Sequence, residues 1–344
     1  MGAASEVLSA KAKAMFGQRL QSEDYQAMMQ KKSVAEVAAY LKQETYFSDV
    51  LEGINERAVH RGQLEALIRM DLFDRFSSLM RYVDRDRVPF YRYGIIDQEI
   101  RQLLVCIRSL LSQDKLSFIV NVPSHLSKQS TFKIEKLTKV SSYEEILEVV
   151  KGTIYESVLR RYQTATLDNF DFNSCESELR KVYLELVLSQ IDQGFTGQQR
   201  NKVKDIFLSR EELMNVQKIY RMKKYFNYGP EKIKRLIHSE RAHLSKKEIN
   251  DLIETVPADE FLIWLKKTNY RKYIDDSQFL YIEYHMKKIL YVMDKQKMRF
   301  STNPDLVVLA YMMISEMEIQ NIVDIIEGVR YRIPSDKIAR YLIY

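Results

Sequence analysis

The sequence predicts an all-α protein. Glycine and proline, the residues that most often interrupt helices, number only 10 and 6 in 344 residues, against average usages of about 7% and 5%. No proline precedes Pro89 and none lies between Pro123 and Pro230, so both stretches are free to form long helices. Strand patterns are sparse, and we interpret the one run that resembles a strand, Ser117–Val122, as an extended linker because Pro123 follows it.

Three long segments carry apolar residues at three- and four-residue steps, which places those residues on one face of a helix. They are Leu64, Leu67, Ile68, Leu72, Phe76, Leu79, Met80 and Val83 in the first segment; Leu179, Val182, Tyr183, Leu186, Val187 and Ile191 in the second; and Phe279, Ile282, Met286, Ile289 and Met293 in the third. These segments predict three long amphipathic helices.

A short motif recurs three times along the chain. Each copy has a glutamate, an aliphatic residue five positions later, a lysine six later and a tyrosine ten later. The copies begin at Glu36, Glu145 and Glu260, which lie 109 and then 115 residues apart. A similar pattern at a long period indicates an internal repeat, in which one structural unit is built several times.

A second motif recurs in the same order. It consists of a glutamate, an aliphatic residue, any residue, a side-chain amide and another aliphatic residue, and it begins at Glu99, Glu212 and Glu318. It follows the first motif by 63, 67 and 58 residues. A third match supports both motifs, since Leu20, Tyr25 and Met28 lie 224 residues before Leu244, Ile249 and Leu252, the offset that also separates Glu36 from Glu260.

These motifs predict three similar helical units, hereafter the repeats, over residues 1–117, 118–229 and 230–344. The first boundary lies near Ser117. The second lies at Gly229-Pro230, because glycine favours a helix end and proline a helix start. The alternative is a long helical protein whose amphipathic helices merely resemble one another.

The recurring residues of the first motif have two interpretations. Glu36, Glu145 and Glu260 either contact a partner, or they cap or salt-bridge their own helices or face water, and we favour this second, structural interpretation. We interpret the recurring tyrosines as packing residues whose hydroxyls reach the surface, namely Tyr46, Tyr155 and Tyr270. We expect Trp264, in the third copy, to lie in the core.

Catalytic and ligand-binding motifs are missing. The chain has no Gly-x4-Gly-Lys phosphate loop, no Gly-x-Gly-x-x-Gly and no Gly-x-Ser-x-Gly. Its five histidines do not form His-Glu-x-x-His, and the five-residue step from His238 to His243 is unfavourable for shared metal ligation on a helix. Its two cysteines, Cys106 and Cys175, form no metal or disulfide pattern. We therefore expect no catalysis, cofactor, metal or small-molecule ligand.

The sequence also predicts a soluble intracellular protein. The first residues lack an apolar segment of signal-peptide length, and we expect no stretch to approach the roughly 20 apolar residues that span a bilayer. Two free thiols suit a reducing compartment. If the protein works at a membrane, we expect it to work from the surface.

Positive charge is concentrated in one segment. Residues 218–247 contain ten Lys and Arg against Glu231 and Glu240, a net charge of +8, whereas the whole chain carries +6. Aromatic residues interleave with these cations, at Tyr220, Tyr225, Phe226 and Tyr228. This segment either is a solvated helix pair or meets nucleic acid, anionic lipid headgroups or an acidic protein.

The C-terminal stretch resembles a known family. Asn321–Arg330, followed by Ile333-Pro334 and Ile338–Leu342, resembles the ending of the C subunits of V/A-type rotary ATPases, whose eukaryotic counterparts are the d subunits. The helix from Glu212 to Arg221 is similar to the family's matching helix, and Leu20 to Tyr46 is similar to its opening. The second copy of the first motif departs from the pattern at Gly152, which makes the middle repeat the least well defined.

This resemblance implies a non-catalytic coupling protein within an ATP-driven ion-translocating complex. It implies three similar units around a pseudo-threefold axis that form a funnel, whose wide mouth receives the central stalk and whose narrow face sits on the membrane proteolipid ring. The protein is then cytoplasmic and peripheral on the cytoplasmic face of the membrane. It transmits torque for proton or sodium transport and binds no nucleic acid. The expected partner contacts are Glu99, Glu212 and Glu318, which would line the cavity, together with Lys223, Lys224 and Arg235.

Two other functions remain open at this point. One is a basic helical nucleic-acid-binding protein that uses Lys223, Lys224, Lys232, Lys234 and Arg235. The other is a generic helical scaffold built as an open solenoid.

Overall fold

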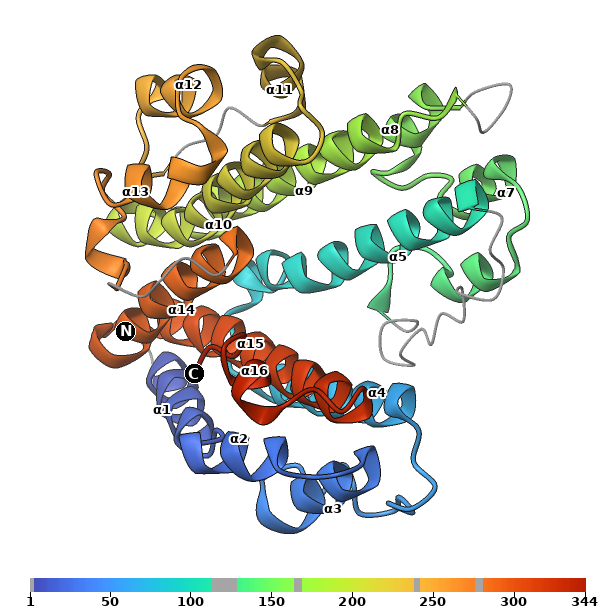
Figure 1. The fold of residues 1–344 in the computed structure, drawn as a ribbon, viewed down its shortest axis with the longest axis vertical. Helices are drawn as coiled ribbons and strands as arrows, with labels where there is room; N and C mark the ends of the chain where they lie inside the picture. Colours follow the sequence, from blue (N-terminus) through green and yellow to red (C-terminus); the bar gives the residue numbers. More distant parts are fainter. Residues whose placement is uncertain (1–2, 113–128, 164–168, 238–241, 276–280) are drawn as a thin grey trace. The chain divides into compact units, whose positions relative to one another are not determined.

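The computed structural model describes residues 3–112, 129–163, 169–237, 242–275 and 281–344. Across these ranges the regular structure is helical and no strand forms, which confirms the all-α prediction (Figure 1). The segment Ser117–Val122, the predicted boundary at Ser117, and His125 and His238 lie outside the described residues. The chain folds into two compact units, which we describe separately.

Compact unit 1 joins both ends of the chain, Met1–Val83 and Leu262–Tyr344. Its helices are α1 (Ala3–Gly17), α2 (Ser22–Met29), α3 (Val34–Glu44), α4 (Arg61–Met80), η6 (Arg271–Tyr273), α14 (Ile282–Phe300), α15 (Pro304–Arg330) and α16 (Ser335–Ala339), while α13 (Phe261–Leu265) begins at the unit boundary. Helix α15 is its centre, because it contacts α1, α2, α3, α4, α14 and α16.

The sequence of α15 explains its central position. Residues 306–314 are all buried, so this part of the helix is apolar on every side and suits a core. The helix starts at a proline, and the Asn303 side chain caps it by accepting hydrogen bonds from the N–H groups of Asp305 (3.0 Å) and Leu306 (3.2 Å).

Helix α15 also corrects one expectation. Within the described part of the chain it is long and apolar enough to cross a membrane by length and composition, contrary to our expectation that no stretch approaches this limit. However, 78% of its most apolar window is buried inside the protein. The apolar residues of α15 therefore form the core of compact unit 1.

Compact unit 2 covers Asp84–Phe261. Its helices are η1 (Arg85–Arg87), η2 (Phe90–Arg92), α5 (Tyr93–Ser112), η3 (Ile134–Lys139), α7 (Tyr143–Val149), α8 (Glu156–Arg161), α9 (Phe172–Gly194), α10 (Gly197–Lys224), α11 (Pro230–Leu236), α12 (Lys246–Glu254) and η5 (Ala258–Glu260). Helix α9 packs against both α5 and α10. Arg180 on α9 forms an ion pair with Asp97 on α5, which also binds Arg101 at 2.7 Å.

One order of helices recurs along the chain. A short helix bears the first motif (α3, α7 and η5–α13), a long amphipathic helix follows (α4, α9 and α14), and the second motif lies on the next long helix (α5, α10 and α15). The three long helices predicted from periodicity are confirmed as α4, α9 and α14, although Val83 follows the end of α4 and Phe279 lies outside the described residues. The break at Gly229-Pro230 separates α10 from α11. The two compact units do not follow the repeat boundaries 1–117, 118–229 and 230–344, which stay a prediction.

Candidate functional site

Glu318 on α15 is buried, and its hydrogen-bond donors come from the other end of the chain. Its Oε2 accepts a hydrogen bond from the backbone N–H of Leu20 at 3.2 Å, and its Oε1 accepts one from the hydroxyl of Tyr46. Leu20 lies just before α2, and Tyr46 just after α3. One carboxylate of the last long helix therefore holds two segments near the start of the chain.

Local geometry makes both donors available. Gln21 caps α2, and its N–H donates to Asp24 Oδ2 at 2.7 Å. The N–H of Leu20 precedes this cap and donates to an acceptor outside the helix. The ring of Tyr46 lies under Arg75, with its centroid 3.8 Å from the guanidinium carbon. Arg75 Nε is held in turn by Asp71 Oδ2 at 2.7 Å.

Burial dominates the electrostatics of this pair. It raises the pKa of Glu318 to about 7, although the hydrogen bonds from Tyr46 and Leu20 and the charges of Arg75 and Arg19 act in the opposite direction. Burial, followed by the nearby Glu318 charge, raises the pKa of Tyr46 well above its ordinary value. Tyr46 therefore remains a neutral donor, while Glu318 titrates near neutral pH.

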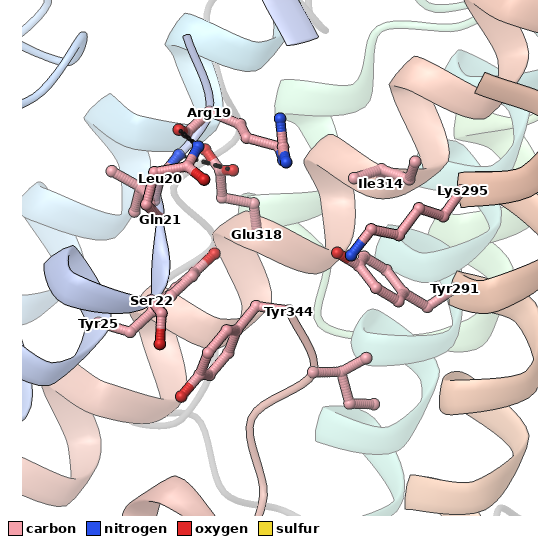
Figure 2. A pocket seen from close by; sticks show the side chains of 11 residues that line it. Arg19, Leu20, Gln21, Ser22, Tyr25, Tyr291, Lys295, Ile314, Glu318 and Tyr344 are labelled. Atoms are coloured by element: carbon pink, nitrogen blue, oxygen red, sulfur yellow. Dashed lines mark hydrogen bonds between the residues drawn. The ribbon is translucent and has the colours of Figure 1, made fainter. Parts of the chain in front are cut away.

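A pocket of about 340 Å³ opens beside Glu318. Figure 2 shows Glu318 in the pocket wall with its carboxylate next to the Leu20 backbone, and the cationic side chains of Arg19 and Lys295 reaching in from the segment after α1 and from α14. The stacked rings of Tyr25 and Tyr344, 4.5 Å between centroids, line another part. The pocket is lined by charged, aromatic and aliphatic side chains.

Glu99 on α5 is bound in a similar way in compact unit 2. It is fully buried. Its carboxylate accepts hydrogen bonds from Ser130 Oγ (2.6 Å), from the backbone N–H and Oγ1 (3.1 Å) of Thr131, and from the hydroxyl of Tyr155 (2.5 Å). Tyr155 follows α7 as Tyr46 follows α3.

Glu212 on α10 is the third case. It is also fully buried, and it accepts hydrogen bonds from three successive backbone N–H groups, those of Ala242 (2.9 Å), His243 (2.9 Å) and Leu244 (3.1 and 3.2 Å). These residues come just before α12, whose capping box consists of Ser245 and Glu248. The matched residues Leu20 and Leu244 thus have the same role, since each donates its N–H to a glutamate of the second motif.

We call these three arrangements the glutamate clasps: Glu99 with Thr131 and Tyr155, Glu212 with Leu244, and Glu318 with Leu20 and Tyr46. A buried carboxylate is costly unless hydrogen bonds compensate it, and charge-assisted bonds are the strongest available. Each clasp supplies such bonds with donors from a different predicted repeat, and at Glu318 they offset only part of the cost, because burial still raises its pKa.

The first motif also has a structural role, mostly as predicted. Glu36 and Glu145 cap their own helices, because their carboxylates accept from the N–H groups of Lys32 (3.0 Å) and Ser141 (2.7 Å). Each glutamate N–H in turn donates to a serine hydroxyl, at 3.2 and 3.3 Å. Glu260 differs, since it is exposed at the end of η5.

The prediction for the tyrosines is confirmed for their packing but wrong for their hydroxyls. The hydroxyls of Tyr46 and Tyr155 bind buried glutamates and do not reach the surface, and Tyr270 is fully buried. The sequence showed both motifs but could not show that they meet, because they lie in different repeats. Trp264 is half-buried, so it is not the core residue that we expected.

Three lysines of the basic segment, Lys223, Lys224 and Lys234, have partners among the described residues. Lys223 Nζ donates to the backbone oxygens of Leu252 (2.9 Å) and Val256 (2.6 Å) beyond the end of α10. Lys224 pairs with Asp259 at 2.6 Å. Arg235 is exposed on α11 and lines a second pocket beside α9.

The structure thus brings each predicted glutamate to a clasp and not to the surface. Of the three, Glu318 lines a pocket. A partner contact through Glu99, Glu212, Glu318, Lys223, Lys224 or Arg235 stays a prediction. In the described residues no group of three or more His, Cys, Asp and Glu is placed to hold a metal ion, and both cysteines are free and buried.

Comparison with known proteins gives one family. The family described as ATP synthase (C/AC39) subunit matches residues 8–341. The A-type ATP synthase C subunit of Thermococcus kodakarensis is 20% identical over 182 residues, which cover 53% of this chain and 47% of that protein. The protein of the same name from Thermococcus onnurineus is 21% identical over the same shares. The matched part of the chain thus spans about half the length of these relatives.

Proposed function

The chain belongs to the ATP synthase (C/AC39) subunit family, and from this premise we propose that it is the non-catalytic component that couples rotation between the central stalk and the membrane proteolipid ring. The observation that carries the proposal is the family match, which extends over residues 8–341. In this role the protein transmits torque for proton or sodium transport and lies on the cytoplasmic face of the membrane.

The glutamate clasps support this function mechanically. Glu99, in the first predicted repeat, binds Tyr155 in the second; Glu212, in the second, binds Leu244 in the third; and Glu318, in the third, binds Leu20 in the first. Hydrogen bonds therefore link the first repeat to the second, the second to the third, and the third back to the first. A socket that turns with an axle needs a wall without a free end, and a clasp between the last and first repeats supplies that connection.

We further propose that the repeats 1–117, 118–229 and 230–344 surround a pseudo-threefold axis as a funnel, with the stalk in the wide mouth and the ring at the narrow face. The support is the recurring order of short helix, long helix and second-motif helix. A torque-bearing wall must also resist local deformation, and buried charge-assisted hydrogen bonds stiffen the junctions between repeats.

Nucleic-acid binding through the basic segment receives less support. Lys223, Lys224 and Lys234 all have internal partners. The partners of Lys234 are Glu231 and Glu254. Filter binding at two salt concentrations tests the alternative, because phosphate contacts weaken steeply as salt rises.

Affinity purification of the tagged full chain from native membranes tests the proposed function. We expect central-stalk proteins and proteolipids in the same complex. Recovery of the chain without either class of partner would reject the proposal. A matched purification of a Glu318→Ala variant shows whether the clasp between the last and first repeats is needed for assembly.

A further inference from the structure

Two turns of the chain share an uncommon backbone conformation. Among described residues other than glycine, Asn227 and Arg332 have positive φ, at 50° and 55°. Each lies in the turn that follows a second-motif helix, Asn227 after α10 and Arg332 after α15. Residues with side chains rarely adopt this conformation. Asn227 lies 15 residues after Glu212 and Arg332 lies 14 residues after Glu318, so the two turns are similar but differ by one residue in length.

Hydrogen bonds support the match. The N–H of Tyr225 donates to Arg221 O at 2.9 Å, and that of Tyr331 donates to Glu327 O at 2.9 Å. Both donors lie 13 residues after the clasp glutamate of their helix. A second bond closes each turn, from Tyr228 N to Met222 O (3.0 Å) and from Ile333 N to Gly328 O (2.8 Å). The turns are therefore ordered by their own backbone bonds.

Both turns present apolar side chains to solvent. Tyr225 is 66% exposed and Phe226 55% exposed in the turn after α10, while Tyr331 is 66% exposed and Ile333 42% exposed in the turn after α15. Apolar and aromatic side chains held outward at the tip of an ordered turn mark an interaction surface.

Cations flank these tips. After α10, Lys232 Nζ lies 3.7 Å from the ring centroid of Tyr228, which itself pairs with Phe226 at 5.6 Å, and Arg221 lies one helical turn before Tyr225. Neither Arg221 nor Lys232 forms an ion pair within the described residues.

The turn after α15 has the same character. The guanidinium of Arg330 lies 5.3 Å from the ring centroid of Tyr331. Arg332 is exposed between Tyr331 and Ile333, and Lys337 is exposed on α16. Asp336 is an exposed acid nearby, but the cations outnumber it.

We infer that each of two turns, 225–228 in compact unit 2 and 331–333 in compact unit 1, contacts the headgroups of anionic lipids. Aromatic rings with a polar edge favour the interface between lipid and water, and neighbouring Lys and Arg are attracted to anionic headgroups. Charge complementarity selects this occupant, because the tips combine exposed apolar surface with excess positive charge. The inference rests on the proposed position at the membrane face, but it assigns a contact with lipid itself, separate from any contact with the proteolipid ring.

Flotation of the purified full chain with protein-free vesicles tests this inference. We expect it to float with vesicles of phosphatidylcholine and phosphatidylglycerol in equal amounts, more weakly as salt rises, and not with vesicles of phosphatidylcholine alone. Tyr225→Ser with Phe226→Ser, and separately Tyr331→Ser with Ile333→Ser, should each reduce the bound fraction several-fold. Arg221→Gln with Lys232→Gln should lower the partition coefficient about fivefold or more per cation.

Matched controls distinguish binding through the two turns from non-specific binding through other exposed side chains. Phe300→Ser removes an aromatic side chain that is 79% exposed beside Arg299, but at the opposite end of the α14–α15 pair, about 40 Å along a 27-residue helix. Lys13→Gln with Lys267→Gln removes two exposed cations elsewhere. These controls should bind vesicles like the parent. Binding of all variants to the same extent, or no flotation of the parent with anionic vesicles, would overturn the inference.

A spectroscopic readout locates the contact directly. Trp264 is the only tryptophan, so Trp264→Phe with Phe226→Trp places a single reporter in the turn. Its emission should shift to the blue with anionic vesicles, and an unshifted emission contradicts insertion of this tip. Binding to a single-stranded RNA oligonucleotide is measured in parallel. Binding to RNA without binding to vesicles would also refute the proposed contact with lipid headgroups. The vesicles contain no protein, so they test contact with lipid alone. A negative flotation result would reject the lipid contact but not the proposed coupling function. Failure of co-purification would reject the coupling function but not the lipid contact.

Discussion

The carboxylate of Glu318 accepts a hydrogen bond from the backbone N–H of Leu20 at 3.2 Å, although 298 residues separate them. With the bond from Tyr46, this contact ties the last long helix to segments near the start of the chain. Glu99 and Glu212 make comparable contacts along the sequence. The proposed coupling function is supported by the glutamate clasps that these three residues form.

We first predict that Glu318→Ala lowers the free energy of unfolding by about 2–4 kcal/mol, because it leaves the Leu20 N–H and the Tyr46 hydroxyl without their acceptor and opens a cavity. Urea denaturation measures this change. Glu52→Ala, at an exposed position of the same compact unit, should change stability by less than about 0.5 kcal/mol. Equal effects of the two substitutions contradict the assigned role of Glu318.

The stability contributed by Glu318 should depend on pH. Burial raises its pKa from 4.5 to about 7, so the folded protein holds this proton more tightly than the unfolded chain. The contribution is fully present below about pH 4.5 and is lost as pH rises through about 7, with a total of about 3 kcal/mol at most. The charged and titratable groups nearby are Arg19, Tyr25, Tyr46, Arg75, Tyr291 and Tyr311.

Comparison with Glu318→Gln isolates this effect from other titrations. Thermal unfolding across this pH range should show a fall in the stability of the parent relative to the variant as pH rises. Parallel profiles of parent and variant would show that Glu318 titrates as it does in the unfolded chain.

Tyr155→Phe should destabilise the protein by about 1–2 kcal/mol, since it removes a donor to the buried Glu99 carboxylate. A double-mutant cycle with Glu99→Gln should give a coupling energy of about 1 kcal/mol or more. Tyr331→Phe, whose side chain is 66% exposed, is the control and should stay within about 0.5 kcal/mol. Additive effects of the Tyr155 and Glu99 substitutions argue against a clasp in solution.

Gly328→Ala should cost about 1–3 kcal/mol, because the added Cβ would lie 2.6 Å from Ile338 Cγ1, where α16 packs on α15. The matched control is Gly62→Ala on α4, whose Cβ meets nothing within 4 Å and should be neutral or stabilise by up to about 1 kcal/mol. Ile338→Ala should cost less in the Gly328→Ala background than in the parent. Denaturant midpoints of the four proteins measure this, and an unchanged cost would exclude the steric explanation.

Local patterns predicted much of the fold. Apolar periodicity predicted α4, α9 and α14, because the three- and four-residue spacing of an amphipathic helix is a local property of the sequence. The capping role of Glu36 and Glu145 was also predictable, because the acceptor and donor lie within four residues of each other. Both successes concern interactions that are close in sequence.

The clasps could not be predicted in the same way. Both motifs were visible, but Tyr46 and Glu318 belong to opposite ends of the chain, and a sequence pattern does not state which distant residues meet. The sequence therefore led us to expect the tyrosine hydroxyls at the surface and the glutamates of the second motif in contact with a partner. One signal was available: a glutamate that recurs among apolar positions, as Glu99 does between Ile96 and Ile100, must be buried with a partner if its helix faces a core.

Rotational coupling is tested most directly by measuring ATP hydrolysis and ion transport together in membranes that contain the rest of the complex, with and without this chain. Without the chain, we expect hydrolysis to proceed with little ion transport, and we expect added parent protein to restore transport. Ion transport per ATP that is unchanged by removal of the chain would contradict the proposed coupling.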